Sequence, residues 1–527
     1  MVTGDHGESL GEHTESGHAF FVYGVTTHVP LILSGPYSGL AGRRIPQVVR
    51  VIDILPTILE LLGVGRPAPG LGISLIPLLR AGAAARPPAY SESYYPRFHF
   101  GWSDLRTLRT DRYRFIEAPR PELYELGTDP EEVVNLASAS PLVVERMREM
   151  LAEAEREMGE STAPPQPAEM DDETQKKLAS LGYIGSTVDT SGVRSADLPD
   201  PKDKIDIVNR MHAAREDQLR GDSDAAIEKL SRVVVDAPEV IDAYFRLGNA
   251  YASSGQLDEA LAMYRKTLSL KPDHDWAVVG MADAYVDMGR IEEAILGYRT
   301  FLRRDPDNEN VTYRLAETLL DAGRLDEAGA TFRRVLEIWP RRASAAVGLA
   351  AVALKRSDPD AARAQIQRAL AIDPSARNAH YNLALALEAQ GDPSGAMAAY
   401  RREISLREQA SSASQASKAR FNLARLLGQA GDRQGQVREL QASLRDNPDF
   451  LLGRYFLAKA LLDAADLAGA EEQARRALAM APDHYYAPLG HYVLADIYNR
   501  QGRPAEAREE ARQGRILESR DLPKPPS

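Results

Sequence analysis

The sequence predicts an α/β head with a small antiparallel sheet, followed by an all-α solenoid of helix pairs. Two observations lead to this. Through the second half of the chain prolines recur every 34 residues, and the apolar residues between them follow helical spacing. The first 137 residues lack that period and mix short strand-like runs with helix-like ones. At 527 residues the chain is also too long for a single core.

The head opens with the stretch TGDHGESLGEH, in which Asp5 and His6 are adjacent. Such a pair at the end of a strand can turn both side chains toward one cation, the carboxylate as a hard ligand and the imidazole as a borderline one. His13, His18 and His28 follow closely. This cluster favours a metal site, although an Asp-His-Gly tripeptide alone is more often a turn and loop histidines are often without function.

The rest of the head reads as short elements in a fixed order. VPLIL (29–33) predicts a buried strand, and PTILELLG (56–63) predicts a helix with Pro at its start and Gly at its end. After GISLIPLL comes a Tyr-rich loop, YSESYYPRFHFGW. The alternating stretch LRTDRYRFIEAP and the following ELYEL predict antiparallel strands, and TDPEEVVNLA begins a turn and a helix.

These blocks, across residues 3–137, resemble the C-terminal half of a sulfatase of the alkaline phosphatase superfamily. The matched order is DHGE, LGEH, HVPLI, VIDILPTILELLG, SLIPLL, LRTDRYRFI and ELYELGTDPEEVVNLA. The resemblance implies that Asp5 and His6 bind a divalent metal, either calcium or, with His as a ligand, manganese or zinc. It also implies that His18 contacts the sulfate or phosphate of an ester substrate, with His13 as a second catalytic candidate.

The same resemblance implies an incomplete hydrolase domain. In the family the Cys or Ser nucleophile and further metal-binding aspartates precede the segment that Asp5 matches. We therefore expect the head to be truncated at its N-terminus, inactive in this chain and unable to hold the metal alone. Two alternatives stay open: a head kept only as a structural cap, and a sulfuric- or phosphoric-ester hydrolase that becomes active once the upstream half is present.

Residues 138–203 predict a helix and a linker. SPLVVERMREMLAEAEREM (140–158) has apolar residues at helical spacing. Residues 159–172 are rich in Pro and acidic groups, 173–185 predict a short helix, and 186–203 an extended, mobile stretch. We expect this joint to act mainly as a tether.

The repeat region, residues 204–520, has position-specific residues between its prolines. The prolines are Pro238, Pro272, Pro306, Pro340, Pro374, Pro448 and Pro482. A small residue lies ten positions after each of the first six prolines. Usually a Gly follows at seventeen, an Ala at twenty-two and a bulky residue at twenty-six. The small residues allow two helices to pack closely, the Gly ends the first helix and the Pro stops the second.

This pattern resembles an array of about nine tetratricopeptide repeats (TPRs), with residues 521–527 left as a tail. The resemblance implies a concave face that binds an extended peptide or a partner protein. Asn382, Asn422, Arg246 and Arg314 occupy the corresponding position in their repeats and are the candidates for peptide contacts. The alternative is a solvated polar position without a ligand.

Composition excludes several kinds of site and partner. The net charge of −12 argues against a nucleic-acid partner, which would require a basic stripe. The absence of Cys excludes disulfides and zinc–thiolate sites within these residues. The sequence contains no run of 18 apolar residues, so it predicts no membrane span. The N-terminus has no signal-peptide pattern. Location stays open, although the resemblance implies an exported or anchored protein; the high Ala and Arg content indicates a bacterial source.

Overall fold

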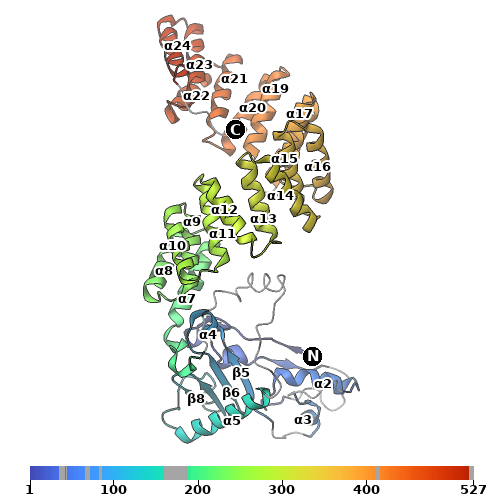
Figure 1. Ribbon diagram of the computed structural model, residues 1–527, viewed down its shortest axis with the longest axis vertical. Coiled ribbons are helices and arrows are strands. Elements are labelled where there is room, and N and C mark those ends of the chain that lie inside the picture. The colour runs from blue at the N-terminus through green and yellow to red at the C-terminus, as the bar shows by residue number, and fades with distance from the viewer. Residues whose placement is uncertain are drawn as a thin grey trace. The chain divides into compact units, whose positions relative to one another are not determined.

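The computed structural model describes residues 1–34, 42, 44–65, 72–81, 86–159, 188, 190, 192–409 and 416–520 (Figure 1). Most of the predicted linker, the short helix expected over 173–185 and the tail lie outside these residues. The chain divides into two compact units, Met1–Met288 and Gly289–Ser527. The first unit contains the head together with the first repeats.

A four-stranded antiparallel sheet forms the centre of the head. Its strands are β5 (Ala89–Ser93), β6 (Leu105–Arg109), β7 (Tyr113–Glu117) and β8 (Glu122–Glu125), paired in that order. The predicted pair of strands, β7 and β8, is confirmed. The stretch expected as a Tyr-rich loop instead forms β5 and the short helix α4 (Tyr95–Phe100), because its first residues pair in register with β6.

The two faces of this sheet bury different partners, as the alternation of side chains along a strand requires. Leu108, Phe115 and Leu123 pack against Val144 and Met147 of helix α5 (Pro141–Gly159), whose position was predicted. The opposite face joins a second core that reaches into the repeats.

The helix expected within TDPEEVVNLA does not form. This segment makes turns, and helix begins only with α5. The Asp129 carboxylate accepts the backbone N–H groups of Val133 and Val134 at 3.0 and 2.8 Å, and Asn135 accepts that of Leu123 at 3.1 Å. These side chains replace the helical hydrogen bonds of the backbone.

Short elements precede the sheet. They are β1 (Val2–Thr3), β2 (Ser9–Leu10), β3 (Ser16–Gly17), α1 (Gly24–Thr27), β4 (Leu31–Ile32), α2 (Ile54–Leu61) and α3 (Ile76–Ala81). The predicted helix is confirmed as α2, and Gly63 follows it with a left-handed φ of 66°. The strand expected to be buried is not, since Ile32 of β4 is 57% exposed and β4 pairs only with β1 among the described residues.

The described end of the linker is packed against the head rather than extended. It forms two 3-10 turns, Ser195–Asp197 and Pro201–Asp203. Asp200 between them is 7% exposed and accepts the backbone N–H of Arg120 at 3.1 Å. Ser103 of the head donates its backbone N–H to Pro199 at 2.9 Å. Residues 195–203 are therefore attached to the head, and the tether role of the linker as a whole stays a prediction.

The repeat region consists of helices, as predicted. In the first unit these are α7 (Ile205–Leu219), α8 (Ser223–Asp236), α9 (Ile241–Ser253), α10 (Leu257–Leu270) and α11 (Asp275–Asp287). In the second they are α12 (Ile291–Leu302), α13 (Glu309–Asp321), α14 (Leu325–Ile338), α15 (Ala343–Lys355), α16 (Pro359–Ile372), α17 (Ala379–Ala389), α18 (Pro393–Gln409), α19 (Ser417–Gln429), α20 (Arg433–Asp446), α21 (Leu451–Asp463), α22 (Leu467–Met480), α23 (Ala487–Arg500) and α24 (Pro504–Glu518). Within the described ranges none of the helices is both long and apolar enough to cross a bilayer.

The repeat positions have the structural roles that their spacing predicts. Tyr264 is 2% exposed and lies between two glycines, Gly248 and Gly280, at each of which a Cβ would come within 2.7 Å of its ring. Gly255 adopts a left-handed φ of 79° after α9. Two repeats without Gly at that position adopt the same conformation, with φ of 59° at Ser357 and 64° at Ala465.

Candidate functional site

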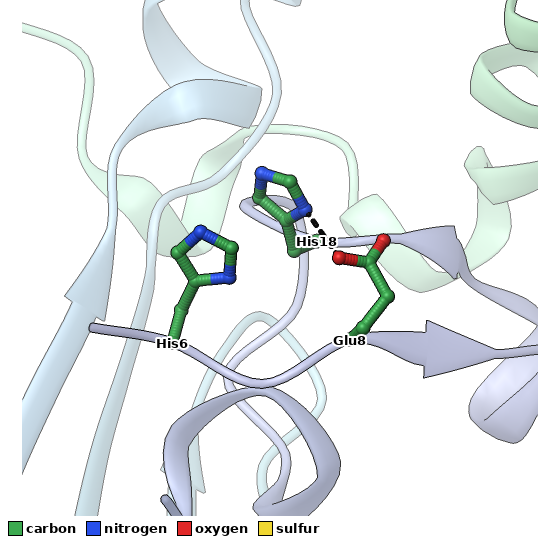
Figure 2. Close-up of side chains that lie close together, drawn as sticks. All are labelled: His6, Glu8 and His18. Carbon is green, nitrogen blue, oxygen red and sulfur yellow. Dashed lines mark hydrogen bonds and ion pairs between the residues drawn. The ribbon is translucent and has the colours of Figure 1, made fainter. Parts of the chain in front are cut away.

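Three polar side chains meet near the N-terminus of the head: His6, Glu8 and His18 (Figure 2). One ligand atom from each lies within 4.8 Å of the others. The imidazoles of His6 and His18 stack with centroids 4.0 Å apart, and Glu8 Oε2 lies 2.9 Å from His18 Nδ1. Figure 2 shows Glu8 directed at His18 beside the two facing rings.

A small hairpin brings these residues together. Ser9 of β2 pairs with Gly17 of β3, so Glu8 and His18 are the next residues outward on the two strands. The Ser9 hydroxyl donates to the carbonyl oxygens of Glu12 and Glu15 at 3.0 and 2.9 Å, which closes the loop between the strands. The register of two very short strands therefore sets the contact between Glu8 and His18.

The His6 ring presents Nε2 as its available ligand atom. Its Nδ1 lies 2.8 Å from the Gly7 carbonyl oxygen, a contact that requires the proton on Nδ1 and leaves a lone pair on Nε2. Asp5 Oδ2 lies 3.9 Å from that Nε2, a separation that one cation at about 2.0–2.2 Å from each atom can bridge. Hydrogen bonds from the backbone N–H groups of Asp5 and His6 lower the pKa of the Asp5 carboxyl, so it is ionised and ready to bind.

The other two histidines do not belong to this cluster. The His13 ring stacks on Tyr23 at 3.5 Å, and burial lowers its pKa against the opposing charges of Glu132 and Glu122. Burial, with a contribution from nearby arginines, also lowers the pKa of His28. His18 thus lies in the cluster and His13 lies outside it; a catalytic role for either residue stays a prediction.

Glu8 was missed at the sequence level, although it is part of the DHGE block. Its spacing of two residues from His6 was the available signal, because alternate residues of an extended chain face the same side. Its pairing with His18, ten residues on, depends on the hairpin register and had no sequence signal.

The four residues suggested for peptide contacts differ in accessibility. Arg314 is exposed, whereas Asn382 retains only 8% exposure and offers little surface to a ligand. Asn422 of α19 is partly exposed and donates from Nδ2 to the hydroxyl of Tyr381 on α17 at 3.2 Å. Arg246 of α9 lies near Tyr95 of the head; burial raises the pKa of Tyr95, and the charge of Arg246 opposes that effect.

Comparison with known proteins links the head to sulfatases. Residues 11–157 match the family model described as "N-sulphoglucosamine sulphohydrolase, C-terminal". Arylsulfatase K of Mus musculus is 33% identical over 153 residues, covering 27% of this chain and 27% of its own. A delta 4,5-hexuronate-2-O-sulfatase of Bacteroides thetaiotaomicron is 29% identical over 143 residues, covering 26% of this chain and 30% of its own. The match thus spans less than a third of the length of either relative.

Other matches link the second half of the chain to tetratricopeptide repeats. Tetratricopeptide repeat models match residues 252–296, 279–343, 347–414 and 488–513. A solved tetratricopeptide repeat protein from Parabacteroides merdae has a TM-score of 0.42 at 16% identity and covers 49% of this chain and 99% of its own. The family models assign repeats from the end of α9 to α18 and again in α23 and α24, and the helix hairpins of the structure agree with them there.

Proposed function

We propose that this chain, a sulfatase C-terminal domain joined to a TPR array, is a protein-binding scaffold whose head contributes cation ligands and an ester contact to a sulfatase-type site. The observation that carries the head's role is the convergence of His6, Glu8 and His18, with ligand atoms within 4.8 Å of one another. The substrate class is a sulfate or phosphate ester.

The donor set fits a borderline divalent cation better than calcium. Asp5 and Glu8 offer carboxylate oxygens and His6 offers a nitrogen, a mixture that suits zinc or manganese, whereas calcium prefers six to eight oxygens. A bound cation would polarise the ester oxygens and stabilise negative charge. Asp5, His6 and Glu8 are the residues that would hold it.

His18 then has two tasks. Its Nδ1 lies 2.9 Å from Glu8 Oε2, and such a hydrogen bond fixes the direction of a ligating carboxylate. The second task is the contact with the anionic group of the substrate that the resemblance to sulfatases implies for His18. His18 therefore orients Glu8 and binds the anionic group of the substrate.

A metal titration of the full chain tests the head. The sequence led us to expect a head unable to hold the metal alone, but Glu8 adds a third ligand to Asp5 and His6. We therefore expect saturable binding of Zn²⁺ or Mn²⁺ by calorimetry, weakened at least about tenfold in His6→Ala and Glu8→Gln. His491→Ala is a matched control, because His491 forms a comparable pair with Glu510, Nδ1 to Oε2 at 2.7 Å, in the array. Binding that is absent, or that His491→Ala weakens as much as His6→Ala does, would contradict the proposal.

Ester hydrolysis is not expected from this chain alone. The matched region is only 27–30% of the length of the two sulfatases described above, and we expect residues from outside that region to complete their sites. The measurement is turnover of p-nitrophenyl sulfate and p-nitrophenyl phosphate with added Zn²⁺ or Mn²⁺. Turnover that disappears in Asp5→Ala would show that the 527 residues carry a complete site.

The scaffold role concerns the repeats. We expect an extended peptide to bind the array through polar contacts, with Asn422 and Arg314 the accessible candidates. A peptide selected from a random library on the full chain, then followed by fluorescence anisotropy, should bind at least tenfold more weakly to Asn422→Ala and Arg314→Ala together. Unchanged affinity in that double variant would remove these residues from the binding face.

A further inference from the structure

Helix α7, the first helix of the repeats, also forms part of the hydrophobic core of the head. Phe20 and Trp102 of the head are buried in one hydrophobic cluster with Ile205, Val208 and Met211 of α7. The α4 segment of the head contributes Phe100 to the same cluster; Figure 1 shows α4 and α7 as neighbours. Because these residues share one core, α7 cannot be displaced without exposing apolar surface of the head.

The side chain of Asn209 on α7 forms hydrogen bonds with the backbone of the loop between β2 and β3. Its Nδ2 donates to the Thr14 carbonyl oxygen at 2.6 Å, and its Oδ1 accepts the backbone N–H of Ser16 at 3.3 Å. One amide side chain thus satisfies an acceptor and a donor on either side of Glu15, as a paired strand would. One turn further along α7, His212 Nδ1 lies 3.4 Å from the Ser16 carbonyl oxygen.

The loop that Asn209 holds has an unusual backbone. His13 and Thr14 adopt φ values of 51° and 64°. The left-handed region is unfavourable for residues with a Cβ, so such conformations persist where surrounding contacts impose them. The hydrogen bond that Asn209 donates to Thr14 and the one that it accepts from Ser16 are contacts of this kind.

The loop leads directly to the candidate site. Ser16 and Gly17 form β3, their pairing with Leu10 and Ser9 sets the register of the hairpin, and His18 follows at once. If Ser16 moves, the register that places His18 against Glu8 is no longer imposed.

We propose that Asn209 is a positioning residue for the site: the first repeat, through this one amide, sets the geometry of the His6, Glu8 and His18 cluster. The array is therefore not a passive attachment to the head, and a change in the first repeat alters the head's affinity for its cation. This inference rests on the proposed function only where it concerns cation affinity; the geometric part stands without a metal.

The test uses the full chain with ¹⁵N-labelled histidine, which is practical because the chain has only 10 histidines. The first readout is the imidazole ¹⁵N shifts of His6 and His18 without metal, and the second is Zn²⁺ affinity. Asn209→Ala should change the His18 shifts and weaken Zn²⁺ binding about tenfold. Asn209→Asp, which keeps the acceptor for Ser16 and loses the donor to Thr14, should give a smaller change.

Asn249→Ala is the matched control. Asn249 of α9 accepts a hydrogen bond from the Tyr264 hydroxyl at 2.8 Å, so the same substitution removes an amide inside the repeats. We expect both readouts to match those of the unmodified chain. If Asn209→Ala leaves the His18 shifts unchanged, or if Asn249→Ala changes them as much, the proposal is overturned.

The two proposals fail in different ways. If the unmodified chain binds no Zn²⁺, the metal role of the head is lost, while the metal-free shifts still decide the role of Asn209. If Asn209→Ala does not fold, the decision falls to Asn209→Asp: unchanged His18 shifts in that folded variant would overturn the proposal.

Discussion

Arg114 and Glu132 form an ion pair, Nε to Oε1 at 2.5 Å, inside the head, where their side chains are 1% and 3% exposed. The pair also fixes the segment that follows the candidate site. Glu132 Oε2 accepts the backbone N–H of Gly24 at 2.7 Å, and Arg114 donates to the Val22 carbonyl oxygen at 2.8 Å. Strand β7 and the turn before α5 thereby hold residues 22–24 in place.

Glu132→Ala should destabilise the head strongly. It leaves the guanidinium of Arg114 buried without its counter-charge, which in other proteins costs about 3–5 kcal/mol. Urea unfolding followed by the fluorescence of Trp102, the head's buried tryptophan, measures the change. Arg112→Ala breaks the more exposed pair with Glu125 and should cost about 0–1 kcal/mol. Equal losses in the two variants would contradict the role assigned to the buried pair.

Glu15 should make the head less stable as the pH rises. Its side chain is 3% exposed, and burial raises its pKa above the ordinary 4.5, against the hydrogen bonds that Oε1 accepts from the backbone N–H groups of Phe21 and Phe20. Between 4.5 and the raised value the folded state alone keeps the proton. The stability that this proton supplies is complete below 4.5 and is lost as the pH rises through the folded pKa.

Glu15→Gln removes that dependence, because an amide does not titrate. The free energy of unfolding of the variant, relative to the unmodified chain, should increase from about pH 4 to about pH 7.5. Urea unfolding at several pH values measures it, with Glu149→Gln on the exposed side of α5 as a control. A difference between Glu15→Gln and the unmodified chain that is constant over this range would show that Glu15 does not titrate in the window.

Two array helices are followed by a non-glycine residue with a left-handed φ, and a change to Gly at either position should stabilise the array. Ser357 and Ala465 adopt φ values of 59° and 64°, where Gly has no steric cost. Ser357→Gly and Ala465→Gly should each raise the stability of the array by about 0.5–1 kcal/mol, since relief of strain exceeds the added freedom of the unfolded chain. Thermal unfolding by circular dichroism measures it.

A change to Gly inside a helix should instead destabilise the array. Ala398 is exposed in the interior of α18, and Ala398→Gly should lower stability by about 0.5–1 kcal/mol. Loss of stability in Ala465→Gly comparable to that in Ala398→Gly would mean that the left-handed conformation at Ala465 is not strained.

The repeats could be predicted from sequence because each hairpin is a local structure. The contact between Gly248 and Tyr264 spans 16 positions and returns at a fixed spacing, so the pattern itself reports the packing. In the head, β7 and β8 have five and four residues, with Tyr, Phe, Ile and Leu among them, and this strand-like composition made them predictable. Strand β5 was not, because Tyr, Ser and Pro around it are typical of a loop, and only pairing with β6 makes it a strand.

The site was only half predictable for the same reason. Asp5 and His6 are neighbours in sequence, and their side-chain chemistry makes them candidate ligands. The contact of Glu8 with His18 depends on β2 and β3, which have two residues each and leave no periodic signal. The hydrogen bonds of Asn209 with Thr14 and Ser16 join residues almost 200 positions apart in the sequence. A single Asn in a helix gives no sequence pattern from which such a contact could be predicted.

Gly248 packs directly against the ring of Tyr264, and a substitution there should destabilise only the neighbouring repeats. In Gly248→Ala the new Cβ would lie 2.7 Å from Tyr264 Cε1, closer than such atoms approach, so Tyr264 or helix α9 must shift. We expect a loss of about 1–3 kcal/mol in the free energy of unfolding. Tyr264→Leu combined with Gly248→Ala should lose less than the sum of the two single changes, because the smaller side chain makes room for the methyl group. Hydrogen exchange should rise in α9 and α10 and stay unchanged in α23 and α24, since repeats contact only their neighbours; an equal rise in both places would show that the array unfolds as one cooperative body.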